Sequence, residues 1–354
     1  MSLRGHLKPM KPKLYERYSR QILFTGIGER GQERLLASRV ALVGCGALGT
    51  AIANLLVRAG VGALRVIDRD FVEESNLQRQ MLFEEADARE SFPKAVAAER
   101  RLRAINAGVQ IEGIVADVTP ANAEDLLAGF DLLLDGTDNF ETRFLVNDVA
   151  VKLRIPWIYS AVVASYGVTL PIHPGRTACL ACLAEPDKAP GAPGLEDTCD
   201  TVGVLGPAAG VAASLAAGEA MKILTLVGDR PPATRLVSCD VWTGQFRSVQ
   251  VVRDANCRAC IRREFRYLEG EAVPHITLCG RDSVQIHEHG RALDLVSLEK
   301  QLAPVAANVR QNGFLLRFSV NSYEVTVFSD GRAIIKGTKD PAAARALYAR
   351  YLGA

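Results

Sequence analysis

The chain has 354 residues, of which 48% are apolar, and its 42 basic and 40 acidic residues leave a formal net charge of +2. This length suffices for one large domain and one small domain, and the balanced charge does not favour a nucleic acid or an anionic membrane as partner. The sequence has no run of about 18 apolar residues. Its basic N-terminus lacks an apolar signal region, so we expect a cytoplasmic protein.

Strand and helix patterns alternate from about residue 38 to 160. Apolar runs predict buried strands at 37–46, 63–70, 109–118 and 130–137, and helical patterns lie between them at 47–60, 92–106 and 123–129. Nearly unbroken apolar strands separated by helices are typical of parallel sheets covered on both faces. We therefore predict an α/β, doubly wound, Rossmann-like fold with a mostly parallel sheet.

The next segment is less regular. Residues 183–198 are rich in proline, glycine and charge, which predicts a mobile surface loop. A strongly apolar stretch from Pro207 predicts a buried helix, and residues 236–252 predict strands.

A change of composition near residues 268–274 marks the start of a small C-terminal α+β domain. Its strands are expected at 276–288, 313–320 and 323–337, and its helices at 293–305 and 340–352, the last with Asp340 as N-cap. The predicted organisation is an N-terminal extension at 1–14, a large domain at 15–268 and the small domain at 269–354.

A glycine-rich turn follows the first predicted strand. Gly44, Gly46 and Gly49 stand between that strand and a helix, where bare backbone can approach a phosphate and the helix N-terminus favours an anion. Asp68 ends the next strand, where a carboxylate can accept hydrogen bonds from ribose hydroxyls. The turn predicts a nucleotide but leaves NAD and ATP both open.

A group of polar side chains points to ATP. Most of them lie at or just after the carboxyl ends of predicted strands, where open α/β sheets bind ligands: Asp70, Asn76, Arg79, Gln80, Lys94, Asp138 and Asn139. Arg79 and Lys94 can neutralise phosphate oxygens, and Asp138 can hold Mg²⁺, which prefers carboxylate, water and phosphate oxygens. A hydride-transfer enzyme has little need for such a set.

Four of the eight cysteines form two C-x-x-C pairs, Cys179 with Cys182 and Cys257 with Cys260. Two such pairs can supply the closed tetrahedral thiolate site of a structural zinc ion. The long interval between the pairs means that the zinc would clip together two distant segments of one domain. The alternative is a pair of redox motifs, but neither pair directly follows the first strand of a βαβ unit.

The other cysteines are of two kinds. Cys45, Cys239 and Cys279 are expected to be small buried apolar residues. Cys199 ends the predicted loop at 183–198, which makes it a candidate nucleophile or sulfur acceptor. Two neighbouring carboxylates would, however, disfavour its thiolate.

These features together resemble the ThiF/MoeB/HesA family, the bacterial relatives of ubiquitin-activating enzymes. The resemblance covers about residues 15–265 and is carried by Arg17-Tyr18-Ser19-Arg20-Gln21, GCGALG, DRDFVEESNLQRQ, Pro93-Lys94, Thr137-Asp138-Asn139 and the paired C-x-x-C motifs. The strings RYSRQILFTGIGE and PWIYSAVVASYGV look closest to the ThiF-like branch of thiazole synthesis.

The resemblance implies an activity. Members use ATP and Mg²⁺ to adenylate the C-terminal glycine carboxylate of a ubiquitin-like sulfur-carrier protein ending in Gly-Gly, with release of pyrophosphate, for thiamine or molybdopterin biosynthesis. It assigns Asp68 to the ribose and Asp138 to Mg²⁺. It assigns Asn76, Arg79 and Lys94 to the phosphates and the transition state.

The resemblance also implies partners. Arg20 is expected to reach the active site of a partner subunit in a functional homodimer. Cys199 matches the crossover-loop cysteine of the family, which can bond covalently to carrier or sulfur. No rhodanese domain is expected, since Cys279 lacks that domain's cysteine-centred loop, so a cysteine desulfurase or another donor must supply the sulfur.

Three features depart from the family pattern. Gly46-Ala47 replaces the usual Gly-Gly. Ser91-Phe92 precedes Pro93-Lys94 where Gly-x is common, so we expect the turn that carries Lys94 to differ slightly. The C-terminal domain does not belong to the minimal enzyme, and dimer packing, lid packing and partner docking are all open as its role.

Three other functions compete with this interpretation. An NAD-dependent oxidoreductase would use the glycine turn and Asp68 equally well. Adenylation of another carboxylate, such as that of a tRNA base, would keep the chemistry but would call for a basic surface with interleaved aromatic residues. A non-enzymatic scaffold would predict loss of Arg79, Lys94 or Asp138, and all three are present.

Overall fold

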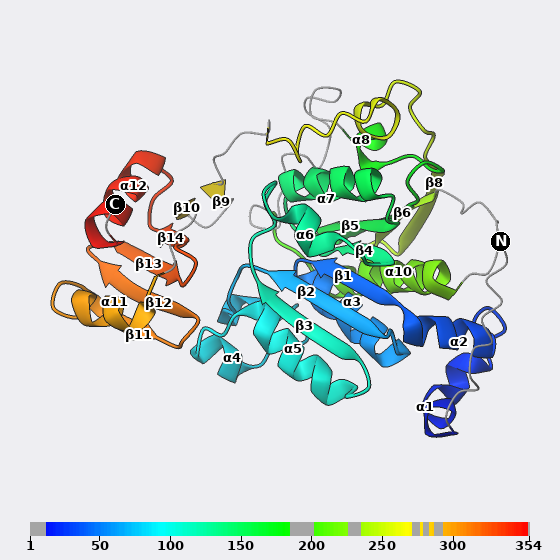
Figure 1. Cartoon of the computed structure of the whole chain (residues 1–354), viewed down its shortest axis with the longest axis horizontal. Helices are drawn as coiled ribbons and strands as arrows, with labels where there is room; N and C mark the ends of the chain where they lie inside the picture. Colours follow the sequence, from blue (N-terminus) through cyan, green and yellow to red (C-terminus); the bar gives the residue numbers. More distant parts are fainter. Residues whose placement is uncertain are drawn as a thin grey trace.

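The computed structural model describes residues 12–184, 202–225, 235–270, 277–278, 283–286 and 293–352. These residues form a large α/β domain with one eight-stranded sheet and a small C-terminal domain with one six-stranded sheet (Figure 1). Both agree with the predicted fold class. Within the described residues no helix is long and apolar enough to span a membrane.

The large sheet has the strand order β3-β2-β1-β4-β5-β6-β7-β8. Its strands are β1 (Arg39–Val43), β2 (Ala63–Asp68), β3 (Gln110–Val115), β4 (Leu132–Asp135), β5 (Trp157–Val163), β6 (Tyr166–Ile172), β7 (Arg235–Asp240) and β8 (Gln245–Gln250). The first five strands pair in parallel, as predicted. The last three add to the sheet as an antiparallel meander, whose direction the apolar pattern alone does not reveal.

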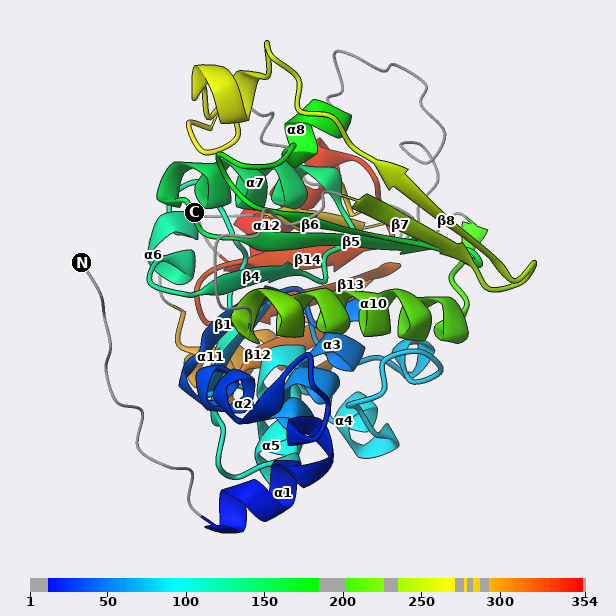
Figure 2. The ribbon, with the colours of Figure 1, turned by 90° about the vertical axis from the view of Figure 1, so that its right-hand side faces the viewer.

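Helices cover both faces of the large sheet (Figure 2). One face carries α3 (Ala47–Ala59), α5 (Lys94–Ile105) and α10 (Gly206–Thr225), and the other carries α6 (Ala123–Leu127) and α7 (Phe140–Leu153). The alanine-rich face of α10 is buried and packs on α3 in the core beneath the sheet, which confirms the predicted buried helix. The described part of this domain also contains α1 (Pro12–Ile22), α2 (Gly28–Ala37), α4 (Glu85–Arg89), α8 (Leu180–Leu183), the 3₁₀ helix η1 (Glu74–Asn76) and the π-helix η2 (Arg258–Arg262).

The small domain is an antiparallel sheet with two helices. Its strand order is β11-β12-β13-β14-β10-β9. The elements are β9 (Thr277–Leu278), β10 (Ser283–Ile286), α11 (Leu295–Leu302), β11 (Ala307–Gln311), β12 (Leu315–Val320), β13 (Tyr323–Phe328), β14 (Ala333–Lys336) and α12 (Pro341–Leu352). Asp340 Oδ1 accepts the backbone N–H of Ala342 at 2.9 Å, as expected of the predicted N-cap.

The strand β11 was not predicted. Its sequence, ANVRQ, alternates weakly, and the structure leaves most of its side chains exposed or half-buried. The strand exists because it pairs with β12, with a shift of register between Ala307 and Arg310. An edge strand with no buried face leaves little hydrophobic pattern in the sequence.

Candidate functional site

The candidate site lies at the carboxyl end of the parallel strands. Neighbouring strands β1 and β4 are separated in sequence by β2 and β3, so the strand order reverses between them. Open α/β sheets bind ligands at such a switch point, outside the carboxyl ends of the strands. Gly44 follows β1, Asp68 ends β2, and Gly136 and Asp138 follow β4, so the predicted site residues come to the same edge.

The three glycines of the turn have different roles. Gly44 has φ +89°, and a Cβ on it would lie 2.6 Å from the carbonyl carbon of Gly136. A Cβ on Gly49 would lie 2.0 Å from the carbonyl oxygen of Gly44. Both glycines are therefore required by packing. A Cβ on Gly46 would have its nearest neighbour, Gln80 Nε2, at 4.0 Å, so Gly46 borders open space at the N-terminus of α3.

Gln80 supports a ligand in that space. Its side chain is only 3% exposed, and its Oε1 atom has no hydrogen-bond partner among the described residues. A buried amide oxygen without a partner costs free energy that a bound ligand or water would recover. The open Gly46 backbone and the adjacent Gln80 amide thus fit a polar ligand such as a nucleotide phosphate or sugar.

Asp68 ties the glycine turn to the neighbouring strand. Its Oδ2 atom accepts the backbone N–H of Cys45 at 2.6 Å, and its Oδ1 atom accepts that of Asp70 at 2.7 Å. Burial raises the pKa of the Asp68 carboxyl, and the nearby Lys94 opposes that rise. Each oxygen keeps a second lone pair, so Asp68 can still accept ribose hydroxyls while it holds the turn.

Lys94 stands beside Asp70 at the start of α5. Its side chain is buried, and its Nζ atom lies 3.0 Å from Asp70 Oδ2. Ser91, which precedes it in place of the usual glycine, has φ +48°. This is the left-handed region that favours glycine. The expected difference from the turn of the family stays a prediction.

Asn76 and Arg79 follow on a short turn. Asn76 is fully buried at the end of the 3₁₀ turn Glu74–Asn76, and its Oδ1 atom accepts the backbone N–H of Glu73 at 3.1 Å. The Arg79 guanidinium donates to the carbonyl oxygen of Ser75 at 2.7 Å. This bond between residues four apart holds Arg79 close to the turn.

The carboxyl end of β4 contains a buried ion pair that the sequence analysis missed. Asp135 is 1% exposed, and its Oδ2 atom lies 3.2 Å from Arg143 Nε. Its Oδ1 atom accepts both the N–H and the hydroxyl of Thr137, at 2.8 and 2.7 Å. Burial raises the pKa of the Asp135 carboxyl, against the opposing effect of Arg143. The pair fixes the turn that presents Asp138, which is exposed.

Asn139 is the N-cap of α7, where its Oδ1 atom accepts the N–H of Thr142 at 2.8 Å. This structural role accounts for the residue without a nucleotide. Its assignment to nucleotide binding stays a prediction.

Arg69 is a further cation that the sequence analysis missed. Its Nη1 atom lies 3.2 Å from both carboxylate oxygens of Asp117, which follows β3. Burial opposes its charge, but Asp117, Asp70 and Asp138 together hold the pKa of the guanidinium above its usual value. The sequence does contain a signal for this residue. Arg69 and Asp117 each follow a parallel strand, which is where open α/β sheets bind ligands.

The four predicted metal ligands come together at the other side of the domain. The Sγ atoms of Cys179 and Cys182 lie 3.9 Å apart, those of Cys179 and Cys257 3.6 Å, and those of Cys182 and Cys260 3.5 Å. These distances are too long for a disulfide. Tetrahedral zinc with bonds of about 2.3 Å requires sulfur atoms about 3.8 Å apart, so the cluster fits such an ion.

A buried ion pair joins this cluster to α7. Arg258, between the last two cysteines, lies 3.4 Å from Asp148 on α7, and Asp148 also accepts the N–H of Tyr267 at 3.0 Å. Burial raises the pKa of Asp148 to about 6, while Arg258 acts to lower it. Helix α7 therefore begins at the candidate nucleotide site and passes beside the cysteine cluster.

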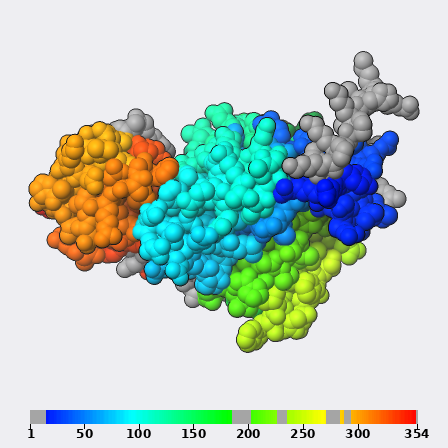
Figure 3. Space-filling view, turned by 90° about the horizontal axis from the view of Figure 1, so that it is seen from below, coloured from blue at the N-terminus to red at the C-terminus, as the bar shows by residue number. Residues whose placement is uncertain are grey.

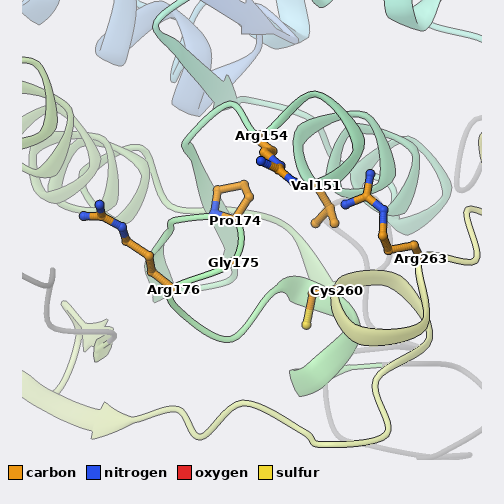
Figure 4. A pocket seen from close by; sticks show the side chains of 7 residues that line it. All are labelled: Val151, Arg154, Pro174, Gly175, Arg176, Cys260 and Arg263. Carbon is orange, nitrogen blue, oxygen red and sulfur yellow. The ribbon is translucent and has the colours of Figure 1, made fainter. Parts of the chain in front are cut away.

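A hollow of about 270 Å³ lies next to the cluster, lined by Cys260, the C-terminal end of α7 and three arginines, Arg154, Arg176 and Arg263 (Figure 4). Figure 4 shows the side chain of Arg176 pointing away from the other two. The hollow therefore does not gather its three positive charges on one point.

Two predicted residues remain, Cys199 and Arg20. Cys199 lies outside the described residues, as do Cys279 and residues 185–198 of the predicted loop. Arg20 is exposed on α1, where its neighbour Gln21 donates to the carbonyl oxygen of Ala59 at the C-terminal end of α3. The glycine turn lies at the other end of that helix of 13 residues, about 20 Å away.

The other cysteines confirm their predictions where they can be described. Cys45 and Cys239 are both fully buried, and burial raises the pKa of each thiol. Neither is a reactive thiolate.

Comparisons with known proteins identify the family of this chain. A sulfur carrier protein ThiS adenylyltransferase of Bacillus subtilis is 43% identical over 342 residues, which are 95% of this chain and 99% of that protein. That match extends through most of the C-terminal domain. A molybdopterin-synthase adenylyltransferase of Escherichia coli is 37% identical over 245 residues, covering 69% of this chain and 95% of that protein.

Solved structures share the fold. The crystal structure of Escherichia coli MccB with ATP is similar with a TM-score of 0.59 and 23% identity, over 69% of this chain and 74% of that chain. The sequence pattern of the ThiF family matches residues 18–259, including the glycine turn, the polar cluster and three of the four clustered cysteines. This chain belongs to the ThiF family.

Proposed function

We propose that this protein uses ATP to adenylate the C-terminal glycine carboxylate of a ubiquitin-like sulfur-carrier protein, with release of pyrophosphate. The product serves sulfur transfer in thiamine or molybdopterin synthesis, the roles for which the relatives are named. The observation that carries the proposal is the convergence of an open glycine turn, a buried lysine and an exposed aspartate at one switch point of the sheet. A reducing compartment such as the cytoplasm would keep the clustered thiols free to bind metal.

The residues present suit ATP and Mg²⁺. Gly46 and Gln80 would border the nucleotide, and Asp68, next to the glycine turn, would accept the ribose hydroxyls. Lys94, Arg79 and Asn76 would contact the phosphates, and Asp138 would hold Mg²⁺, which neutralises phosphate charge. Arg69 adds positive charge beside Asp138.

The chemistry needs no protein base, because a terminal carboxylate is already ionised near neutral pH. One of its oxygens attacks the α-phosphorus of ATP, and the bond from that phosphorus to the β-phosphate bridge oxygen breaks. The carrier leaves as an acyl-adenylate, and pyrophosphate takes the electron pair of the broken bond. The contribution of the protein is to align the two groups and to stabilise negative charge with Lys94, Arg79 and Arg20.

We further propose that the cysteine cluster holds zinc in a structural role. Four thiolates at tetrahedral spacing leave no open position for a reacting water, so the site suits stability. The family resemblance places sulfur chemistry at Cys199, and a separate cysteine desulfurase or other donor would provide the sulfur.

Arg20 can complete the site only across a homodimer. Exposed Leu23 and Phe24 follow it at the end of α1, with 68% and 63% of their surface open, which supports a protein contact there. We expect Arg20→Ala and Asp138→Ala each to lower pyrophosphate exchange at least about a hundredfold. Mixed subunits should recover about one quarter of the activity, since half of random dimers would hold one intact site of two. Mixed dimers that recover no activity would place Arg20 outside the partner's site.

The main test is direct. The protein is incubated with ATP, Mg²⁺ and purified ThiS-like and MoaD-like carriers, and each carrier is weighed by mass spectrometry. We expect an added AMP on one carrier, and none on the same carrier lacking its terminal glycine. Absence of the adduct from every carrier would overturn the proposal. A change of NADH absorbance on addition of small substrates would support the oxidoreductase instead.

A further inference from the structure

The small C-terminal domain touches the large domain next to the candidate ATP site. Figure 3 shows it against the part of the surface formed by the chain after β2. The contacts fall on two short segments, residues 71–73 and residues 90–92. Asp70 directly precedes the first segment and Asn76 follows it, while Lys94 comes two residues after the second.

The first segment, residues 71–73, is held by an ion pair and by apolar packing. Lys336 on β14 places its Nζ atom 2.6 Å from Glu73 Oε1. Phe71 packs in a small apolar cluster with Leu315, Phe328 and Ile334 of the small domain. The guanidinium of Arg317 lies 4.4 Å from the centre of the Phe71 ring. The small domain thus fixes Phe71 and Glu73 together.

The second segment is held by its backbone. Asn312 Nδ2 donates to the carbonyl oxygens of Glu90 and Ser91, at 2.7 and 3.2 Å. Phe314 packs edge-on against Phe92, with ring centres 5.4 Å apart. Ser91 is the residue in the left-handed conformation that glycine favours. Asn312 therefore contacts the turn where this chain departs from the family pattern.

The two segments are also bonded to each other. The backbone N–H of Val72 donates to the carbonyl oxygen of Phe92 at 2.8 Å, and that of Lys94 donates to the carbonyl oxygen of Asp70 at 2.9 Å. A displacement of either segment would therefore move the Asp70–Lys94 pair. The small domain contacts both sides of this connection.

Glu73 provides the most direct connection to Asn76. Its side chain accepts the backbone N–H of Asn76, and the Asn76 side chain accepts the N–H of Glu73, so the two residues form a capping box around the 3₁₀ turn. The same Glu73 carboxylate pairs with Lys336, and both side chains are largely shielded from water, with exposures of 20% and 30%. The pair is screened less than one on the open surface.

We propose that the C-terminal domain positions the phosphate-binding residues, and that Lys336 is a positioning residue that acts on Asn76 and Lys94 through Glu73. This inference rests on the proposed function of the site. It gives the small domain a role in the adenylation step that a minimal enzyme, without this domain, must fill in another way. Small displacements of groups that align reacting atoms reduce turnover strongly.

Lys336→Met tests the inference, because methionine keeps the apolar stem beside Phe71 but removes the charge. We expect kcat for carrier-dependent pyrophosphate exchange to fall about tenfold, with the carrier KM and the melting temperature unchanged. Lys336→Arg should restore the rate, since it restores the charge. Lys300→Met, which changes an exposed lysine on α11 of the same domain, is the matched control and should be neutral.

Glu73→Gln gives an independent check. Glutamine can still cap the 3₁₀ turn but cannot form the ion pair. We expect the same loss as for Lys336→Met, and no further loss in the double variant, since both changes remove the Lys336–Glu73 pair. Lys336 also lies 3.6 Å from Glu324 on the neighbouring strand, and Glu73→Gln leaves that second pair intact.

Unchanged kcat in Lys336→Met would overturn the inference. A loss that follows only the folded fraction and is not rescued by arginine would also overturn it, because it would show a merely structural contact. If the unmodified protein itself shows no exchange with any carrier, the proposed function fails, and this inference fails with it.

Discussion

Asp138→Ala is expected to lower carrier-dependent pyrophosphate exchange at least about a hundredfold and to leave the fold and the metal content unchanged. Asp138 is exposed after β4, so its substitution removes no core contact. The turn that carries it is held by the buried pair of Asp135 and Arg143, whose guanidinium donates to the carbonyl oxygen of Thr137. The loss would come from the missing Mg²⁺ ligand at the point where phosphate charge must be neutralised. The measurement is exchange of labelled pyrophosphate into ATP, with circular dichroism as the check on folding.

Asp125→Ala is the matched control for this variant. Asp125 is an exposed aspartate on α6 in the same domain, away from the carboxyl ends of the strands. It should exchange pyrophosphate at the rate of the unmodified protein. Normal exchange in Asp138→Ala would remove Asp138 from the mechanism and would direct attention to other carboxylates at that edge, such as Asp70 and Asp117.

The dependence of the exchange rate on Mg²⁺ concentration gives a second test of this prediction. If Asp138 holds the ion, the Asp138→Ala variant should need a higher Mg²⁺ concentration than the unmodified protein to reach half of its own maximal rate. An unchanged Mg²⁺ requirement together with a lower rate would mean that Asp138 acts mainly by its charge on Arg69, whose pKa it helps to raise.

The sequence patterns predicted the features that depend on neighbours along the chain. The buried strands β1 and β4 are nearly unbroken apolar runs, and the turn after β1 needs glycine at Gly44 and Gly49 for packing. A parallel sheet gathers the carboxyl ends of its strands on one edge, so Asp68 and Asp138 could be placed together without coordinates. The cysteine pairs could be predicted as metal ligands equally well, because each C-x-x-C motif presents two thiolates to a metal ion from one short turn.

The missed residues depend on pairs that are far apart in sequence. Arg69 meets Asp117 across 48 residues, and Lys336 meets Glu73 across 263. An isolated charged residue has the same pattern whether it is solvated or paired, so only the fold separates the two cases. The Asp135–Arg143 pair is closer in sequence, but its burial follows from the packing of α7 on the sheet.

The departure at Ser91 lies outside what the sequence could place. Ser91-Phe92 stands where the family resemblance leads us to expect Gly-x, which predicts a slightly different turn before Lys94. The structure gives Ser91 a left-handed backbone, at φ +48°, and a contact from Asn312 of the small domain. That contact joins residues 221 apart in the sequence, so no local pattern could indicate it.

Removal of one cysteine ligand is expected to abolish metal binding by the four-cysteine cluster and to destabilise the domain, while the nucleotide site stays intact. Cys257→Ala and Cys239→Ala make the same change at two fully buried cysteines, of which only the first belongs to the cluster. Cys239→Ala should keep one zinc per chain, measured by atomic emission, and should melt within a few degrees of the unmodified protein. Cys257→Ala should lose its zinc and melt about 10 °C lower, since loss of a metal site costs about 4 kcal/mol or more.

The reason for the loss lies in what the cluster joins. Cys257 and Cys260 belong to the segment after β8, and Cys179 and Cys182 belong to the segment after β6, 78 residues earlier. Without the metal, the later segment keeps its contacts with α7, namely the buried Asp148–Arg258 pair and the stacking of Tyr267 on Phe144. The nucleotide site lies at the other end of that helix of 14 residues, about 20 Å away. Folded Cys257→Ala at low temperature should therefore still adenylate carrier, and a full zinc content in this variant, or an equal zinc loss in Cys239→Ala, would contradict the clip.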